Sequence, residues 1–154
     1  MKNKYFLITI FSLILGVTSC SKDDSQSASE MLSSKTWVIE SKMLSPSIIY
    51  AGVEITDITL FETDETKDYA FTFNSDGTLL VRNASNNLIL DSTWAFNSDE
   101  TELIFGETLI YAIPLVGDIG YSSIAIKSIT SSEIVGSVTM PFEGTIYTVT
   151  MTFK

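Results

Sequence analysis

Apolar and polar side chains alternate along most of the chain from residue 36 onward, in short segments separated by polar turns. The last segment is the clearest: Tyr147, Val149, Met151 and Phe153 would share one face of a strand, and three threonines the other. Such alternation, rich in β-branched and aromatic residues, is typical of strands with one buried face. It predicts strands over residues 36–43, 69–73, 78–83, 88–96, 101–105, 122–129, 133–140 and 145–153, with residues 108–113 as a candidate for one more.

In the first predicted strand, residues 36–43, the alternation places apolar residues on one face and charged residues on the other. Trp37, Ile39 and Met43 fall on one side of the strand, and Glu40 and Lys42 fall on the other. Because successive side chains of a strand point to opposite faces, we expect the apolar set to be buried and the charged pair to face solvent.

The turns between the segments are short, and several carry residues that hairpins need. Asp76-Gly77, within residues 74–77, is the strongest of them, because glycine tolerates the positive φ of a tight hairpin turn. Strands joined in this way form a meander, and closing the meander removes exposed edges that invite aggregation. We therefore expect an all-β fold, an up-and-down antiparallel β-barrel of about eight strands. A barrel of this size either fills with its own side chains or holds one small ligand.

Residues 45–67 do not fit a plain meander, because they are too many for a structureless loop in a compact domain. They are also rich in apolar residues, which must pack on something. Ile55, Ile58 and Phe61 recur every three residues, which favours a short helix or a lid over the barrel.

The N-terminal residues have the order of a secretory signal. A short positive segment with Lys2 and Lys4 precedes an apolar run to residue 17 and two small residues. The run is shorter than the roughly 20 residues that span a bilayer, which favours a cleaved signal over a transmembrane helix. Cys20, the sole cysteine, follows directly, and a lone cysteine cannot form an internal disulfide.

Residues 17–20 resemble a bacterial lipoprotein signal box, with Val17 where leucine is more common. The resemblance implies cleavage before Cys20, acylation of its sulfur and amine, and a membrane anchor through the lipid. Several acyl chains hold a protein stably, whereas one anchors it only reversibly. Residues 21–25 resemble the export tag that sends Bacteroidetes lipoproteins to the cell surface. A polar tether, with the protein kept on the inner leaflet of the outer membrane, is the alternative.

The domain also resembles a family. Residues 32–37, 67–78, 92–94, 129–130 and 152–154 occur in the order found in lipocalin-like lipoproteins of Bacteroidetes, although Ser34 stands where that family usually has glycine. The resemblance implies a lipocalin-like barrel with Trp37 at its base and residues 48–61 as a lid. The expected organisation is a signal peptide (1–19), an acylated cysteine and tether (20–30) and a lipocalin-like barrel domain (31–154).

Composition excludes several functions. The chain has no histidine, its one cysteine is assigned to the anchor, and no phosphate-binding glycine loop is present. Imidazole-based catalysis, thiol nucleophiles and nucleotide cofactors are therefore not expected. The formal net charge is −10 and Arg82 is the sole arginine, which argues against nucleic-acid binding.

Four carboxylates, those of Glu62, Asp64, Glu65 and Asp68, lie close together in sequence. A carboxylate pair can hydrolyse glycosides, and a carboxylate group can bind calcium. A solvated acidic loop explains the same residues, and we favour it. We accordingly expect no enzyme activity, no catalytic residue, no metal and no cofactor.

Two functions remain. The first is binding of a small apolar or amphipathic ligand in the barrel, and the second is a filled barrel that binds a protein or glycan through its loops. Periodicity cannot separate a core from a pocket lining. For the second function, Tyr50, Tyr111 and Tyr121 are the expected exposed contacts. For the first, the candidate ligand-binding residues are Trp37, Ile55, Ile58, Phe61, Phe71, Phe73, Ser92, Trp94 and Phe96.

Overall fold

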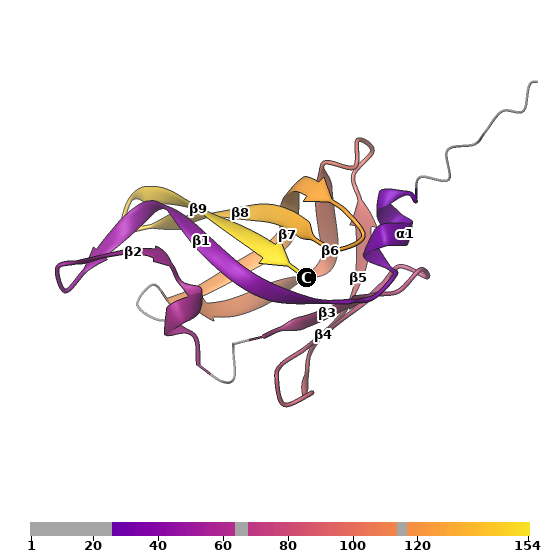
Figure 1. The fold of residues 1–154 in the computed structure, drawn as a ribbon, viewed down its shortest axis with the longest axis horizontal. Helices are drawn as coiled ribbons and strands as arrows, with labels where there is room; N and C mark the ends of the chain where they lie inside the picture. The colour runs from indigo at the N-terminus through magenta and orange to yellow at the C-terminus, as the bar shows by residue number, and fades with distance from the viewer. Residues whose placement is uncertain (1–25, 64–67, 114–116) are drawn as a thin grey trace, which may run out of the picture.

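A computed structural model describes residues 26–63, 68–113 and 117–154. The described chain is almost entirely strand, with one short helix at its start and one 3-10 turn (Figure 1). The elements are α1 (Ala28–Leu32), β1 (Thr36–Tyr50), β2 (Val53–Asp57), the 3-10 turn η1 (Thr59–Phe61), β3 (Ala70–Phe73), β4 (Thr78–Arg82), β5 (Leu88–Phe96), β6 (Glu102–Ile113), β7 (Gly117–Ile129), β8 (Ile134–Phe142) and β9 (Thr145–Phe153).

The strands form a closed, antiparallel, eight-strand barrel, which confirms the expected fold class. Around the barrel, β1 is followed by β3 and then by β4 to β9 in sequence order, and β9 returns to pair with β1. β2 stands outside the ring and pairs only with the far half of β1. All the paired strands and all the residues of the hydrophobic core lie within residues 26–154, as expected of a segment that folds as one domain. We call this segment the barrel domain.

α1 marks the closed end of the barrel. Ser27 and Glu30 form a reciprocal capping box that satisfies free backbone N–H groups at its start. The indole of Trp37, which is fully buried, donates to the carbonyl of Leu32 at 2.7 Å and so fixes the helix against the barrel. α1 and the β1–β2 hairpin lie at opposite ends of the long axis (Figure 1).

The strand predictions were correct in place but too short for β1, β6 and β7. β6 begins at Glu102 and runs on through the second predicted segment, 108–113, and its pairing with β7 shifts register between Ile104 and Leu109. The predicted 74–77 hairpin is confirmed. Gly77 has φ +84°, and its N–H donates to the carbonyl of Asn74 at 3.0 Å.

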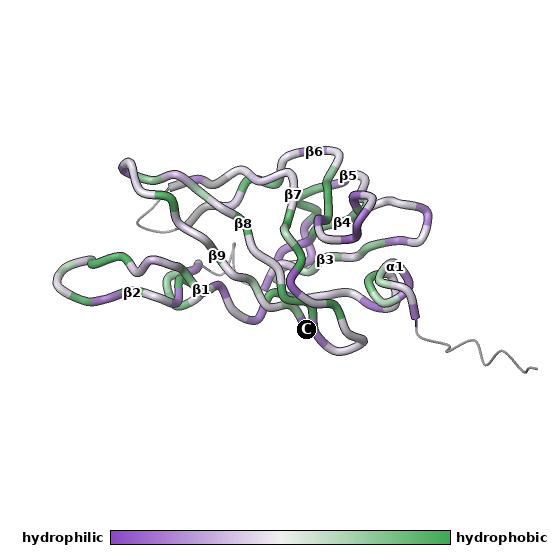
Figure 2. The backbone as a smooth tube through the Cα atoms, turned by 90° about the horizontal axis from the view of Figure 1, so that it is seen from above, coloured by the Kyte–Doolittle hydropathy of each residue, from purple (hydrophilic) through white to green (hydrophobic). Residues whose placement is uncertain are grey.

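The lid segment is a hairpin, and the predicted short helix is wrong except for the single turn η1. β1 continues to Tyr50, and β2 returns after a two-residue turn in which Ala51 and Gly52 have φ +50° and +79°. Positive φ at both central residues is what a tight hairpin turn requires. Figure 2 shows apolar stretches on this projecting hairpin, and Ile49 and Val53 are exposed there.

A β-bulge in β1 reverses the faces that the alternation predicted. The pairing of β1 with β9 shifts between Ile39 and Ser41, so the inward set changes by one residue. Met43, expected inside, is 44% exposed, and Lys42, expected outside, is only 2% exposed. The prediction for these two residues was therefore wrong.

The core at the closed end, as far as the described residues show it, is closely packed around one small cavity. A cavity bounded by Leu32, Phe73, Leu103 and Phe153 among others measures about 10 Å³, which holds one water molecule at most. Residues 1–25, with Cys20 and the predicted signal, lie outside the described residues. Among the helices that the structure describes, none is long and apolar enough to cross a membrane.

Candidate functional site

A buried polar cluster lies inside the barrel toward the lid end. The Lys42 ammonium donates to Glu62 Oε1 and to the Tyr111 hydroxyl, and the Tyr111 hydroxyl also donates to Glu62 Oε1. The Lys42 nitrogen lies 4.1 Å from the centre of the Tyr111 ring, at cation–π distance. We call Lys42, Glu62 and Tyr111 the polar cluster.

Three elements bring the cluster together. The backbone N–H of Ile58 donates to the Lys42 carbonyl at 3.1 Å, and the Lys42 N–H donates to Thr59 Oγ1 at 2.9 Å. These bonds fold the segment after β2 back across β1, so that Glu62, immediately after η1, reaches the interior. Tyr111 comes from the far half of β6. The lid segment therefore supplies the carboxylate of the cluster.

Burial perturbs both ionisable groups of the pair. The side chains of Lys42 and Glu62 are only 2% and 1% exposed. Loss of water around the ammonium lowers the pKa of Lys42, and loss of water around the carboxylate raises the pKa of Glu62. In each case the pairing partner opposes the shift without cancelling it. A buried ion pair of this kind contributes little to stability by itself, which favours a functional role as an explanation for it.

The second oxygen of the Glu62 carboxylate has no hydrogen-bond partner. Within the described ranges, Glu62 Oε2 is the one fully buried side-chain nitrogen or oxygen atom in this condition. Such an acceptor costs about 1–3 kcal/mol when left unpaired, so it marks a place where a donor is missing. The cluster is thus one hydrogen-bond donor short of completion.

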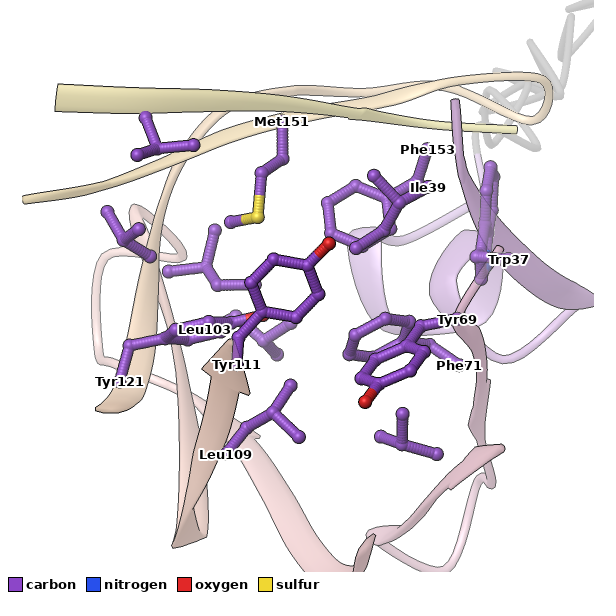
Figure 3. Packing of buried hydrophobic residues seen from close by; sticks show 14 of the residues in the cluster. Trp37, Ile39, Tyr69, Phe71, Leu103, Leu109, Tyr111, Tyr121, Met151 and Phe153 are labelled. Atoms are coloured by element: carbon purple, nitrogen blue, oxygen red, sulfur yellow. The ribbon is translucent and has the colours of Figure 1, made fainter. Parts of the chain in front are cut away.

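Aromatic rings surround the cluster. Tyr69 and Tyr111 meet edge to face, with ring centres 5.5 Å apart. Figure 3 shows Tyr111 projecting into the barrel, between Tyr69 and Tyr121 in this view. Burial, followed by the charges of Tyr69 and Glu62, raises the pKa of Tyr121. Tyr111 and Tyr121 are 3% and 9% exposed, so their prediction as exposed contacts was wrong; Tyr50 is 52% exposed, as expected.

The barrel wall opens beside Tyr121. β7 and β8 pair only from Ala125↔Ser137 to Ile129↔Ile134, and nearer the lid end β8 pairs only with β9. A hollow of about 310 Å³ lies where the two strands part, lined by Gly120, Tyr121, Ser122, Ser123, Ser137, Val138 and Thr139, among others. We call this hollow the β7–β8 opening. Its lining combines exposed residues, such as Ser122 and Thr139, with the buried residues Tyr121 and Val138.

The predicted aromatic site residues lie together, in the closed half. Phe71 stacks on Phe73 at 6.2 Å, Phe73 meets Trp94 at 5.6 Å, and Trp94 meets Phe96 at 5.9 Å between ring centres. The Trp94 indole donates to the Asn74 carbonyl in the turn at the closed end, at 3.0 Å. Trp37, Phe71 and Phe73 are buried in the hydrophobic core, and Trp94 and Phe96 are partly buried and pack against it.

The other predicted residues are dispersed. Ile55 and Ile58 belong to the lid segment and are buried, and the Ile58 N–H bonds to the Lys42 carbonyl, whereas Phe61 is 38% exposed. Ser92 is buried, but its hydroxyl accepts the Glu107 N–H at 2.9 Å and so serves the backbone. The structure therefore separates the lid residues from the aromatic set.

The acidic loop is only partly what we expected. Glu62 was predicted to be solvated and is buried; that interpretation was wrong for this residue, because η1 turns it inward. Asp68 is exposed, and Asp64 and Glu65 lie outside the described residues. In the part of the chain that the structure describes, acidic, cysteine and histidine side chains form no group that could hold a metal.

Sequence reasoning missed the polar cluster altogether. One signal was available for Lys42. Leu44 is apolar and lies two residues after Lys42, so the two side chains share one face of the strand, and a bulge that turns Leu44 inward also turns Lys42 inward. Gly52, one residue before the alternation resumes at Val53, was a signal for the lid hairpin. No comparable signal marked Glu62, because its burial depends on a long-range contact.

Comparison with known proteins adds no family. No protein-family model matches the chain, and no curated protein matches it significantly in sequence. The resemblance to lipocalin-like lipoproteins stays a prediction, and the function has to be argued from the barrel and its polar cluster.

Proposed function

We propose that this protein is a membrane-anchored, lipocalin-like lipoprotein whose barrel takes up a small amphipathic ligand at the lid end. The observation that carries the proposal is the polar cluster, with its unpaired Glu62 Oε2, buried near an opening in the barrel wall. Binding sites of this type combine mostly apolar walls with a few placed polar groups. Tyr69, Tyr121 and Met151 supply buried, largely apolar surface around the cluster.

The lid end suits uptake better than the closed end does. The cavity described at the closed end measures about 10 Å³, too small for any organic ligand, whereas the β7–β8 opening, which is open to solvent, measures about 310 Å³. The aromatic residues predicted to bind a ligand are therefore assigned to the core in this proposal. Ile58, whose N–H donates to the Lys42 carbonyl, keeps a role as a buried apolar residue beside the polar cluster.

The proposed anchor is lipid on Cys20, at the outer membrane and exposed on the cell surface. In the described chain, α1 comes first and lies at the closed end, so a tether of about ten residues would hold that end toward the membrane. The lid end and the opening would then face away from the bilayer, where a ligand arrives. Metabolic labelling with a fatty acid tests this: label should enter the wild type and not Cys20→Ser, and equal labelling would contradict it.

Native mass spectrometry of the barrel domain tests uptake. The domain should begin at Gln26, to keep the Ser27 cap, and should be released from its native membrane by proteolysis of the tether without detergent. The proposal expects an extra mass that is lost on denaturation, and expects less of it in Tyr121→Trp, which adds bulk at the opening. A bare polypeptide, also after incubation with a lipid extract from the same cells, would contradict uptake.

A second function, a filled interaction module, is favoured by one separate observation. The lid hairpin exposes several large apolar side chains, Ile49, Tyr50 and Val53, which are 68%, 52% and 63% exposed. Apolar patches of this kind mark interaction sites when they are contiguous. A photoreactive amino acid in place of Tyr50 should then cross-link a defined partner on intact cells. The same amino acid in place of Asp99, which is also exposed, should not capture that partner.

A further inference from the structure

We infer that the polar end of the ligand is a hydrogen-bond donor, a hydroxyl or an ammonium group, which Glu62 Oε2 accepts. The inference rests on the proposed uptake of an amphipathic molecule and specifies its headgroup. It distinguishes long-chain alcohols and amines from fatty acids.

The hydrogen-bond inventory of Glu62 is the first argument. Its Oε1 atom already accepts from both Lys42 and Tyr111, whereas Oε2 is buried and accepts from nothing. An ionised carboxylate can only accept hydrogen bonds, so the missing partner must be a donor. A hydroxyl or ammonium group supplies one, and an ionised carboxylate supplies none.

The charges around the cluster are the second argument. Lys42 is the cation of the cluster, and Glu62 already neutralises it. Asp57 and Asp68 act electrostatically on both members of the pair, and both are acidic. An anionic headgroup would meet three carboxylates and one ammonium, and would have to displace Glu62 from Lys42. A neutral headgroup avoids this repulsion, and a cationic one is attracted.

The surroundings fit an amphipathic molecule of this polarity. The residues that line the β7–β8 opening include the acidic Glu102, the hydroxyl-bearing Ser122, Ser123 and Thr139, and the buried Tyr121 and Val138. Tyr121 is one of the lining residues, and Tyr111 projects into the barrel beside it in the view of Figure 3. A chain lying against Tyr121 would bring its polar end toward Glu62, whose charge reaches Tyr121.

A headgroup series on the wild-type barrel domain tests the inference without any mutation. Dodecanol, dodecylammonium and dodecanoate share one chain and differ only at the polar end. Displacement of a fluorescent apolar probe gives their relative affinities below the critical micelle concentration. We expect dodecanol and dodecylammonium to bind about tenfold or more tightly than dodecanoate, since an unpaired buried acceptor and an added anion both disfavour the acid.

Glu62→Gln sharpens the test, because it exchanges an acceptor for a donor at one position. Lys42 and Tyr111 both need an acceptor, so the amide oxygen should stay with them and the NH2 group should replace Oε2. Dodecylammonium should then lose about tenfold or more in affinity, dodecanoate should gain, and dodecanol, which both donates and accepts, should change little. Glu107→Gln, the same change at an exposed residue of β6, should alter none of the three.

The outcomes separate the two proposals. If none of the three compounds displaces the probe from folded wild-type protein, uptake of such amphiphiles itself fails. If dodecanoate binds the wild type most tightly, uptake stands and the donor headgroup is overturned. Circular dichroism shows whether Glu62→Gln is folded. Since the wild-type series decides the question alone, a variant that fails to fold leaves the inference testable.

Discussion

Replacing Lys42 by methionine should destabilise the barrel strongly, because it removes one member of a buried pair. Methionine keeps an unbranched side chain of similar length in a site that is 2% exposed. The Glu62 carboxylate, 1% exposed, would keep Tyr111 as a donor but would lose its counter-charge. Breaking a buried pair in this way costs about 3–5 kcal/mol, a large part of the roughly 5–15 kcal/mol that stabilises a domain.

The double variant Lys42→Met/Glu62→Met is the matched control. With both charges gone, no buried group is left uncompensated, and replacing a buried ion pair by apolar residues is often neutral or stabilising. We therefore expect the double variant to lie within about 1 kcal/mol of the wild type and well above Lys42→Met. With Glu62→Met as the second single variant, the coupling energy in the cycle should exceed about 3 kcal/mol, the upper end for residues in direct contact.

Urea unfolding followed by tryptophan fluorescence measures these differences, since Trp37 is fully buried and Trp94 is partly buried. With an m-value of about 2 kcal/mol/M, Lys42→Met should lower the unfolding midpoint by roughly 2 M. A loss below about 1 kcal/mol in Lys42→Met, in the range of an exposed pair, would refute the reasoning. So would a double variant that is as unstable as the sum of the single ones.

Three further predictions concern packing and pH. Trp37→Phe removes the indole bond to Leu32 and should lower the unfolding free energy by about 1–3 kcal/mol in urea unfolding, whereas no change would mean that α1 is not held by it. Gly136→Ala should cost about 1–3 kcal/mol in the same assay, because its Cβ would lie 2.4 Å from Ile124 Cγ2; an unchanged midpoint would show that β7 yields freely. Burial raises the pKa of Glu62 above 4.5, so the contribution of Glu62 to the unfolding free energy is greatest below pH 4.5 and falls as the pH rises. Burial lowers the pKa of Lys42 below 10.5, so the contribution of Lys42 is greatest above pH 10.5 and falls as the pH drops. The unfolding free energy of the wild type minus that of the double variant should therefore be lowest at intermediate pH, and a difference that peaks there would contradict the assignment.

The barrel itself was predictable because it depends on local patterns. Alternation and short turns identify strands one at a time, and nearest-neighbour pairing then follows from the turns. The C-terminal segment 145–153 shows this: its Val149, Met151 and Phe153 are all buried, as the alternation predicted. The same logic places Trp37 in the core at the closed end.

The polar cluster was not predictable because it depends on departures from those patterns. The bulge after Ile39 turns Lys42 inward, and a bulge has no reliable mark in a single sequence. Glu62 becomes buried only when Thr59 bonds to the backbone of Lys42, a contact 17 residues away in sequence. A run of carboxylates is usually solvated, and that general rule fails at the one position where the fold provides an ammonium.

A crystal structure of the barrel domain grown with dodecanol tests the central claim most directly. We predict a chain in the β7–β8 opening, beside Tyr121, with its hydroxyl oxygen about 2.7 Å from Glu62 Oε2. We also predict that Lys42 and Tyr111 keep their contacts to Oε1. A barrel whose interior near Tyr121 holds no dodecanol, although titration under the same conditions shows binding, would place the ligand elsewhere and contradict the proposed site.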